Sequence, residues 1–244
     1  MTSESSAAWD IFSDEYQRRS ALSIDSAHYG PDIPTESTLR LLGDLRGKRV
    51  LELGCGGAQA SIAFARAGAI AIGVDTSLAQ LAHAQKLCTA SEVKVELRHA
   101  DMAELAFLRA DSVDVAFSAY AFQYVEDLNR VFRQVHRVLK VGSPLVFSLP
   151  HPSWSMIAED RPDPTISHSY FDRQPGSEVW EGVEFTIYRH SFSDLYGALT
   201  RASYRVDLIL EPPPVAGAPR SWLWNGAMEF VPRTLIVRAR KEGS

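Results

Sequence analysis

The stretch Val50-Leu51-Glu52-Leu53-Gly54-Cys55-Gly56-Gly57 decides the fold of this chain, because an apolar strand runs straight into a glycine turn. A second apolar strand, Ile70-Ala71-Ile72-Gly73-Val74-Asp75, follows and ends in an acid. A strand, a glycine turn, a helix and a second strand that ends in an acidic residue, in this order, are typical of a nucleoside-binding α/β unit. Glycine accepts positive φ without strain, so Gly54 and Gly56 would let a ligand approach the backbone, while Asp75 would accept hydrogen bonds from ribose hydroxyls. The turn therefore predicts a nucleotide-like cofactor.

Residues that the turn lacks narrow the choice of cofactor. A dinucleotide fingerprint that starts at Gly54 would need a glycine at position 59, where the chain has Gln59. A P-loop would need Gly-Lys-Ser/Thr after the turn, and that motif is missing as well. Nicotinamide, flavin and nucleoside triphosphate cofactors are therefore disfavoured. Glycine-rich turns also occur in α/β proteins that bind no cofactor, so the turn alone does not decide between these alternatives.

Composition sets broad limits on the class of protein. The chain has 244 residues, 45% of them apolar and 23% charged, with a net charge of −5, as in an ordinary globular protein. It lacks the broad basic surface that nucleic-acid binding requires, so we expect no nucleic-acid partner. Cys55 and Cys88 form no metal-type pair. Residues 1–10 carry no signal-peptide pattern and no apolar run is long enough to span a membrane, so we expect a cytoplasmic protein with no membrane partner.

Strands and helices alternate through the middle of the chain. Helical spacing of apolar residues predicts three helices, at 60–67, 77–90 and 127–140. Apolar or alternating runs predict strands at 50–53, 70–75, 93–97, 113–118 and 145–149. Five strands joined by helical crossovers indicate a parallel sheet.

The pattern changes after Pro150. Residues 151–190 are rich in proline and aromatic residues and predict an insertion of short strands or loops, followed by a helix at 192–202 and strands at 204–210 and 234–239. Residues 211–232 hold five prolines and predict an ordered loop or a mobile lid. All five tryptophans (9, 154, 180, 222 and 224) lie outside residues 46–150. They would either line an apolar small-molecule pocket or pack the additions onto the domain.

Several segments resemble the motifs of class I S-adenosylmethionine-dependent methyltransferases of the small-molecule, methyltransferase domain 11-like type. The order Glu-x-Gly-Cys-Gly at 52–56 resembles their first motif, with Ala58 at the place of its third glycine. His99-Ala100-Asp101-Met102 is similar to the motif after strand three, and Ser118-Ala119-Tyr120 to the segment after strand four. Residues 137–143, Arg-Val-Leu-Lys-Val-Gly-Ser, resemble the family's "RVLKPGG" turn.

The resemblance implies a Rossmann-like three-layer α/β sandwich with a mostly parallel seven-stranded sheet whose last strand is antiparallel. N-terminal helices and an insertion after strand five, forming a cap, would complete it. We divide the chain into an N-terminal helical cap segment (1–45), a cofactor-binding core (46–150), a substrate-side insertion (151–190) and the C-terminal part of the same domain (191–244).

The resemblance also implies roles for residues at the strand ends. Asp75 would hold the ribose, Asp101 the adenine amine, and Met102 the adenine ring through its backbone, while Ser118 would line the methionine part. Trp9-Asp10-x-x-Ser13-x-x-Tyr16 resembles an N-terminal helix that closes over the cofactor. The expected contacts with S-adenosyl-L-methionine, or its product S-adenosyl-L-homocysteine, are Tyr16, Glu52, Gly54, Cys55, Gly56, Gln59, Asp75, Thr76, Gln80, Asp101, Met102 and Ser118.

The methyl acceptor is less defined. The chain lacks the motifs of nucleic-acid and protein arginine methyltransferases, which leaves methylation of an O, N or C atom of a small molecule, with no metal expected. His151, directly after strand five, is the first candidate for a general base and His190 the second. The expected substrate pocket holds His28, Tyr120, Tyr124, Trp154 and Tyr170. Structural roles remain open for all of these residues.

Two other functions remain open at this point. The chain could be a cofactor-binding sensor or partner protein without methyl transfer, or, less in keeping with Gln59, an NAD-dependent oxidoreductase. We expect a monomer or a homodimer.

Overall fold

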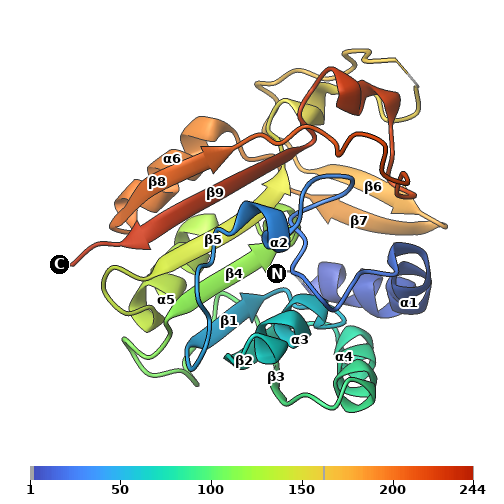
Figure 1. The fold of residues 1–244 in the computed structure, drawn as a ribbon. Helices are drawn as coiled ribbons and strands as arrows, with labels where there is room; N and C mark the ends of the chain where they lie inside the picture. The colour runs from blue at the N-terminus through green and yellow to red at the C-terminus, as the bar shows by residue number, and fades with distance from the viewer. Residues whose placement is uncertain (1–2, 162, 244) are drawn as a thin grey trace.

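A central sheet of seven strands organises the protein. The computed structural model describes residues 3–161 and 163–243, and its strand order is β3-β2-β1-β4-β5-β9-β8 (Figure 1). Five strands run parallel: β1 (Arg49–Leu53), β2 (Ile70–Asp75), β3 (Val95–His99), β4 (Val115–Ala119) and β5 (Pro144–Pro150). The last strand, β9 (Thr234–Lys241), is antiparallel to β5 and to β8 (Tyr204–Leu210). The predicted sheet and its antiparallel last strand are confirmed.

Helices cover both faces of the sheet, and polar side chains fix where they begin. They are α3 (Gln59–Arg66), α4 (Leu78–Ala90), α5 (Leu128–Val138) and α6 (Phe192–Arg201). Ser77 Oγ accepts the N–H of Gln80 at the start of α4, and Ser191 forms a capping box with Asp194 at the start of α6. The helix predicted over 127–140 ends at Val138, because the next residue, Leu139, pairs with Val113 in a parallel bridge.

Successive side chains of β1 point to opposite faces of the sheet and join different hydrophobic cores. Leu51 and Leu53 belong to the core on the face covered by α5 and α6. Val50 belongs to the core on the opposite face, where it joins Phe64 of α3 and Leu42 from the segment after the short helix α2 (Glu36–Leu39). Both faces of the strand are thus buried, as expected for a central parallel strand.

The N-terminal helix α1 (Ser3–Ser20) is fastened to α4 by polar contacts. Asp10 Oδ1 accepts hydrogen bonds from Ser77 Oγ at 2.6 Å and from the N–H of Ala79 at 3.1 Å. One turn further on, Asp14 lies 2.7 Å from His83 Nε2. These bonds place α1 across the carboxyl end of the sheet, beside the glycine turn.

The insertion after β5 builds the cap above the same edge of the sheet (Figure 1). It contains the short 3-10 helix η2 (Trp154–Met156) and an antiparallel hairpin of β6 (Gly176–Trp180) and β7 (Val183–Ile187). Phe185 of β7 is fully buried against α1, with its ring centre 5.0 Å from that of Trp9 and 4.9 Å from that of Trp180. Two further 3-10 turns, η1 (Phe122–Tyr124) and η3 (Gly226–Glu229), complete this region.

Candidate functional site

The glycine turn after β1 uses its two glycines differently. Both adopt positive φ, +69° at Gly54 and +50° at Gly56. A Cβ on Gly54 would lie 2.4 Å from the Cβ of Ala121, so this glycine permits close packing of two protein segments. A Cβ on Gly56 would meet only the side chain of Gln80, at 3.5 Å. The backbone of Gly56 is therefore the part of the turn that a ligand can approach.

Ala58, at the place of the family's third glycine, adopts a left-handed conformation with φ +59° and precedes α3 as its N-cap. The strain of this conformation in a residue with a Cβ is roughly 1–2 kcal/mol. Its methyl group is completely buried, which offsets part of that cost. The substitution of glycine by alanine therefore leaves the turn intact.

Asp75 holds the turn from the end of β2. Its Oδ2 accepts the N–H of Gly56 at 2.8 Å and its Oδ1 accepts the N–H of Ser77 at 2.9 Å. Burial raises the pKa of this carboxyl, while the backbone hydrogen bonds oppose the rise. The backbone N–H of Thr76 also donates to this carboxylate. A carboxylate offers about four acceptor positions, so one remains for a hydroxyl group of a ligand. The acid thus fits the ribose of an adenosine cofactor.

Three glutamine side chains are joined by hydrogen bonds beside the glycine turn. The Nε2 of Gln17, on α1, donates to Gln80 Oε1 at 2.7 Å, and its Oε1 accepts from Gln59 Nε2 at 2.6 Å. The predicted contacts Gln59 and Gln80 are therefore beside the turn, and both are bonded to α1. Gln17 was not singled out from the sequence, because only the docking of α1 brings it here.

Other predicted contacts have structural partners. Glu52 accepts both the N–H and the hydroxyl of Ser61 at the start of α3, and burial raises its pKa to about 8. The Ser118 hydroxyl donates to the carbonyl of Leu53 at 2.9 Å. Cys55 and Met102 are buried in the packing around the turn. Contacts from these four residues to a cofactor remain predictions.

Asp101 and Thr76 follow two neighbouring strands. In the parallel pairing of β2 and β3, Asp75 lies opposite His99, so Asp101 is two residues past the end of β3 beside the turn. Asp101 Oδ1 accepts the N–H of Ala103 at 2.8 Å, and the carbonyl of Thr76 accepts the hydroxyl of Ser6 at 2.7 Å. The adenine contact assigned to Asp101 remains a prediction.

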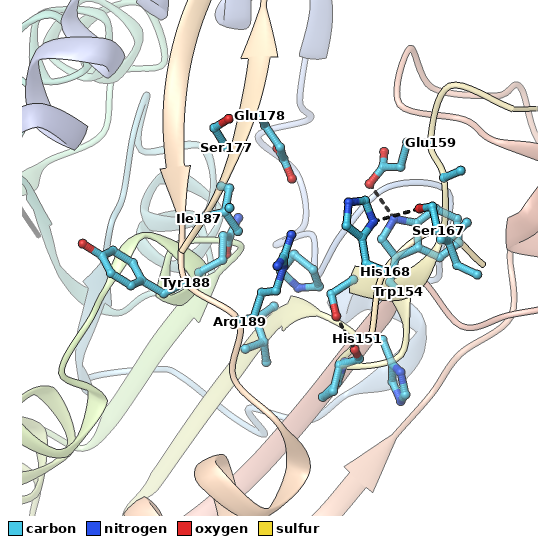
Figure 2. Close-up of a pocket in the computed structure, with 18 of the residues that line it drawn as sticks. His151, Trp154, Glu159, Ser167, His168, Ser177, Glu178, Ile187, Tyr188 and Arg189 are labelled. Atoms are coloured by element: carbon cyan, nitrogen blue, oxygen red, sulfur yellow. Dashed lines mark hydrogen bonds between the residues drawn. The ribbon is translucent and has the colours of Figure 1, made fainter. Parts of the chain in front are cut away.

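Three cavities follow one another along this edge of the sheet. The first, a cleft of about 60 Å³, is lined by Gly54, Gly56, Asp75 and Gln80 together with residues of α1 and of the segment after β4. The second is a cavity of about 150 Å³ with mostly apolar walls that are rich in tryptophan and tyrosine, which we call the aromatic cavity. It shares Trp9, Tyr16, Tyr120 and Tyr124 with the cleft. The third, a cavity of about 520 Å³ with mixed walls that include several charged side chains, is called the polar cavity (Figure 2).

Tyr120 stands between the cleft and the aromatic cavity. It has a positive φ of +52°, which is unusual for a bulky residue and is found at sites where surrounding structure enforces it. Its hydroxyl is fixed 2.6 Å from Thr234 Oγ1 of β9. Tyr16 and Tyr124 line both spaces as well, so these predicted residues lie together.

The remaining predicted substrate residues divide into two groups. His28 and Trp154 line the aromatic cavity. Tyr170 lines none of the three cavities, and instead its hydroxyl accepts the N–H of Phe192 at 3.4 Å. The structure therefore does not bring Tyr170 to the predicted pocket.

His151 and His190 both lie at the polar cavity, away from the cleft. His151 is labelled at the wall of the polar cavity in Figure 2. It is buried, with Nδ1 2.6 Å from Ser153 Oγ and Nε2 2.8 Å from Glu211 Oε1. His190 Nε2 lies 2.9 Å from the carbonyl of Val125. Burial lowers the pKa of both imidazoles. Both ring nitrogens of His151 are thus engaged, which argues against its use as a general base.

Sequence reasoning missed three polar residues at these cavities. Gln123 and Glu178 line both the aromatic and the polar cavity, and Arg233 lines the aromatic one. Arg233 pairs with Glu159 at 3.1 Å and stacks over Trp154, its guanidinium carbon 4.9 Å from the ring centre. None of the three belongs to a motif, so only the folded structure identifies them.

The fold and the strand-end residues together define a class I S-adenosylmethionine-dependent methyltransferase. Residues 51–147 match the family model described as "Methyltransferase domain". A solved S-adenosylmethionine-dependent methyltransferase of Mesorhizobium loti is 28% identical, with a TM-score of 0.68 over 84% of this chain and 96% of that one. The chain is thus an S-adenosylmethionine-dependent methyltransferase, as its motifs predicted.

Two relatives show how far the sequence similarity extends. An uncharacterized protein of Haemophilus influenzae is 26% identical over 86% of this chain and 87% of its own length. A ubiquinone biosynthesis O-methyltransferase of Bordetella avium is 38% identical, but the match spans only 44% of this chain and 45% of that enzyme. The second match covers less than half of either chain.

Two negative findings concern the described residues. Within 3–161 and 163–243, no helix is long and apolar enough to cross a membrane. In the same part of the chain, no group of three or more His, Cys, Asp and Glu side chains is placed to hold a metal ion.

Proposed function

We propose that this methyltransferase acts on an O, N or C atom of a small organic molecule bound in the aromatic cavity. The observation that carries the proposal is that the cleft and the aromatic cavity have four wall residues in common: Trp9, Tyr16, Tyr120 and Tyr124. A molecule in either space would contact the same side chains. The O-methyltransferase named among the relatives is in keeping with oxygen as the atom methylated.

The cleft residues fit the cofactor. Asp75 would hold the ribose hydroxyls, the open backbone at Gly56 would face the amino-acid end, and Asp101 would meet the adenine. Bound S-adenosylmethionine supplies an electrophilic sulfonium methyl group. The chain then has to orient the acceptor and exclude water, and orientation can supply about 7–11 kcal/mol in favourable cases. The helix α1 and the aromatic walls serve both purposes.

Calorimetry with S-adenosylmethionine, S-adenosylhomocysteine and NAD tests the cofactor. We expect micromolar or tighter binding of the first two and none of NAD. Tight NAD binding without the other two would overturn the assignment. Release of S-adenosylhomocysteine in a screen of small aromatic acceptors then tests catalysis. Cofactor binding with no release over a broad screen would favour a binding protein without methyl transfer.

A further inference from the structure

Gln123 carries a buried hydrogen-bond acceptor with no partner. The residue is 5% exposed, and its Oε1 has no hydrogen-bond partner among the residues that the structure describes. Its backbone carbonyl is fixed by the N–H of Tyr188 at 2.8 Å, so the residue is held in place. A buried acceptor without a partner is costly, and a donor on a bound ligand would relieve that cost. Gln123 lines both the aromatic and the polar cavity.

Glu178 supplies a second polar group at the same boundary. It projects from β6 into the polar cavity (Figure 2) and lines the aromatic cavity too. The charged groups that face its carboxyl are Glu159 and Arg233, and the titratable hydroxyl of Tyr124 faces it as well. Burial raises its pKa to about 7, so the carboxyl can hold or release a proton near neutral pH.

The walls of the aromatic cavity indicate what kind of molecule carries the donor. Trp9, Tyr124, Trp180 and Trp222 offer flat apolar surfaces to it. Among the described residues, two arginines line this cavity. Arg233 is paired with Glu159, and Arg19 is paired with Glu15 and Glu181, so neither guanidinium is free to select an anionic ligand. These surfaces suit an uncharged aromatic ring.

We propose that the methyl acceptor is a neutral phenol whose ring lies in the aromatic cavity and whose hydroxyl is bound by Gln123 Oε1 and Glu178, with Glu178 taking up its proton. The proposal rests on the proposed function. In balanced form, the phenol O–H bond breaks and its proton goes to a Glu178 carboxylate oxygen. The electron pair on the phenol oxygen forms the new O–CH₃ bond, while the pair of the broken S–CH₃ bond stays on sulfur.

The histidines at these cavities are less suited to accept the proton. His151, His168 and His190 line the polar cavity but not the aromatic one, which His28 alone among the histidines lines. Burial lowers the pKa of His28 to about 4, so its imidazole is a weak base at neutral pH. His151 has both ring nitrogens engaged, and His190 has its Nε2 at the carbonyl of Val125. Glu178 therefore combines access to the aromatic cavity with a suitable basicity.

Binding to the protein loaded with S-adenosylhomocysteine tests recognition without turnover. The probes are two matched pairs, phenol with anisole and 4-chlorophenol with 4-chloroanisole, measured by calorimetry. We expect wild type to prefer each phenol over its ether at least about tenfold, since a site built for a hydroxyl rejects the analogue that lacks it. Gln123→Leu and Glu178→Gln should reduce the preference below about threefold, while Glu184→Gln, an exposed acid on the same hairpin, should retain it.

Turnover of 4-chlorophenol against pH tests the proton transfer. In wild type, kcat/KM should rise with pH through about 7 as Glu178 loses its proton, and then level off. Glu178→Gln should lower turnover about 10²- to 10⁴-fold and remove this rise, and Glu178→Asp should restore part of both. An unchanged pH profile in Glu178→Gln would overturn the role of Glu178 as proton acceptor.

The outcomes separate this inference from the proposed function. If S-adenosylhomocysteine binds but the phenols do not, or if they bind no better than the anisoles, the phenol site is wrong while the cofactor assignment stands. If S-adenosylhomocysteine itself fails to bind, the proposed function is wrong as well. Thermal melting of each variant shows whether it is folded before its binding is compared.

Discussion

Replacing Asp75 by asparagine tests the residue on which the cofactor assignment depends most. The carboxylate accepts the N–H groups of Gly56 and Ser77, one on each oxygen. An asparagine presents only one acceptor oxygen, so one of the two N–H groups loses its partner. A buried donor without a partner costs about 1–3 kcal/mol. For a protein of this size, we expect the melting temperature to fall by about 2–12 °C.

Cofactor affinity should fall separately from stability. The hydrogen bonds from the ribose hydroxyls should contribute roughly 1–3 kcal/mol less to the binding free energy when their acceptor changes from a carboxylate to a neutral amide. That corresponds to a dissociation constant for S-adenosylhomocysteine about 5- to 150-fold higher. Calorimetry at a temperature well below the melting point of the variant would measure it.

Asp114→Asn is the matched control for this prediction. Asp114 precedes β4 at the opposite end of the sheet, where its carboxylate accepts the N–H of Arg49 at 2.9 Å and forms an ion pair with Lys140 at 2.6 Å. The control should lose stability through the loss of an acceptor and of this ion pair, yet keep its affinity for S-adenosylhomocysteine. Equal affinities in wild type and Asp75→Asn, or equal losses in both variants, would refute the assignment of Asp75 to the ribose.

Two further predictions concern the surroundings of the turn. Because burial raises the pKa of Glu52 from 4.5 to about 8, the folded state binds a proton that the unfolded state releases, and stability should fall between pH 5 and pH 8 by up to about 1.4 kcal/mol per pH unit. Glu52→Gln should flatten this slope in urea unfolding, and an unchanged slope would contradict the raised pKa. Gln17→Ala removes the side-chain hydrogen bonds to Gln59 and Gln80 across the cleft, so α1 should be held less tightly there. We therefore expect S-adenosylhomocysteine to associate about fivefold faster or more, as measured by stopped-flow tryptophan fluorescence. An unchanged association rate would mean that α1 does not limit entry.

The fold could be predicted from the sequence because local and global signals agree there. Leu51 and Leu53 form a buried strand that leads into a glycine turn, and the next strand places Asp75 where its carboxylate meets that turn. The capping residues Ser77 and Ser191 agree with the predicted helices, because each lies at the start of one of them. The boundary of α5 was missed, because the pairing of Leu139 with Val113 is a tertiary contact that helical periodicity does not contain.

The acceptor side could not be predicted in the same way. The position of His151 after β5 suggested a base, but its hydrogen bonds to Ser153 and Glu211 come from segments whose placement no local pattern determines. Glu178 lies in a strand of mixed polarity, where a partly buried acid looks the same in sequence as an exposed one. Its importance comes from the hairpin's docking on α1.

The extent of the family match along the chain explains why the cofactor side could be predicted from the sequence and the acceptor side could not. The family match covers residues 51–147, which include the glycine turn and Asp75. The match therefore concerns the methyl donor. Of the residues proposed to bind the acceptor, Gln123 lies inside that range, whereas Glu178 and most of the aromatic walls come from α1, the hairpin and the loop before β9. Changes in those three segments can alter the acceptor without disturbing the cofactor cleft, so a relative that matches only the core carries little information about the substrate.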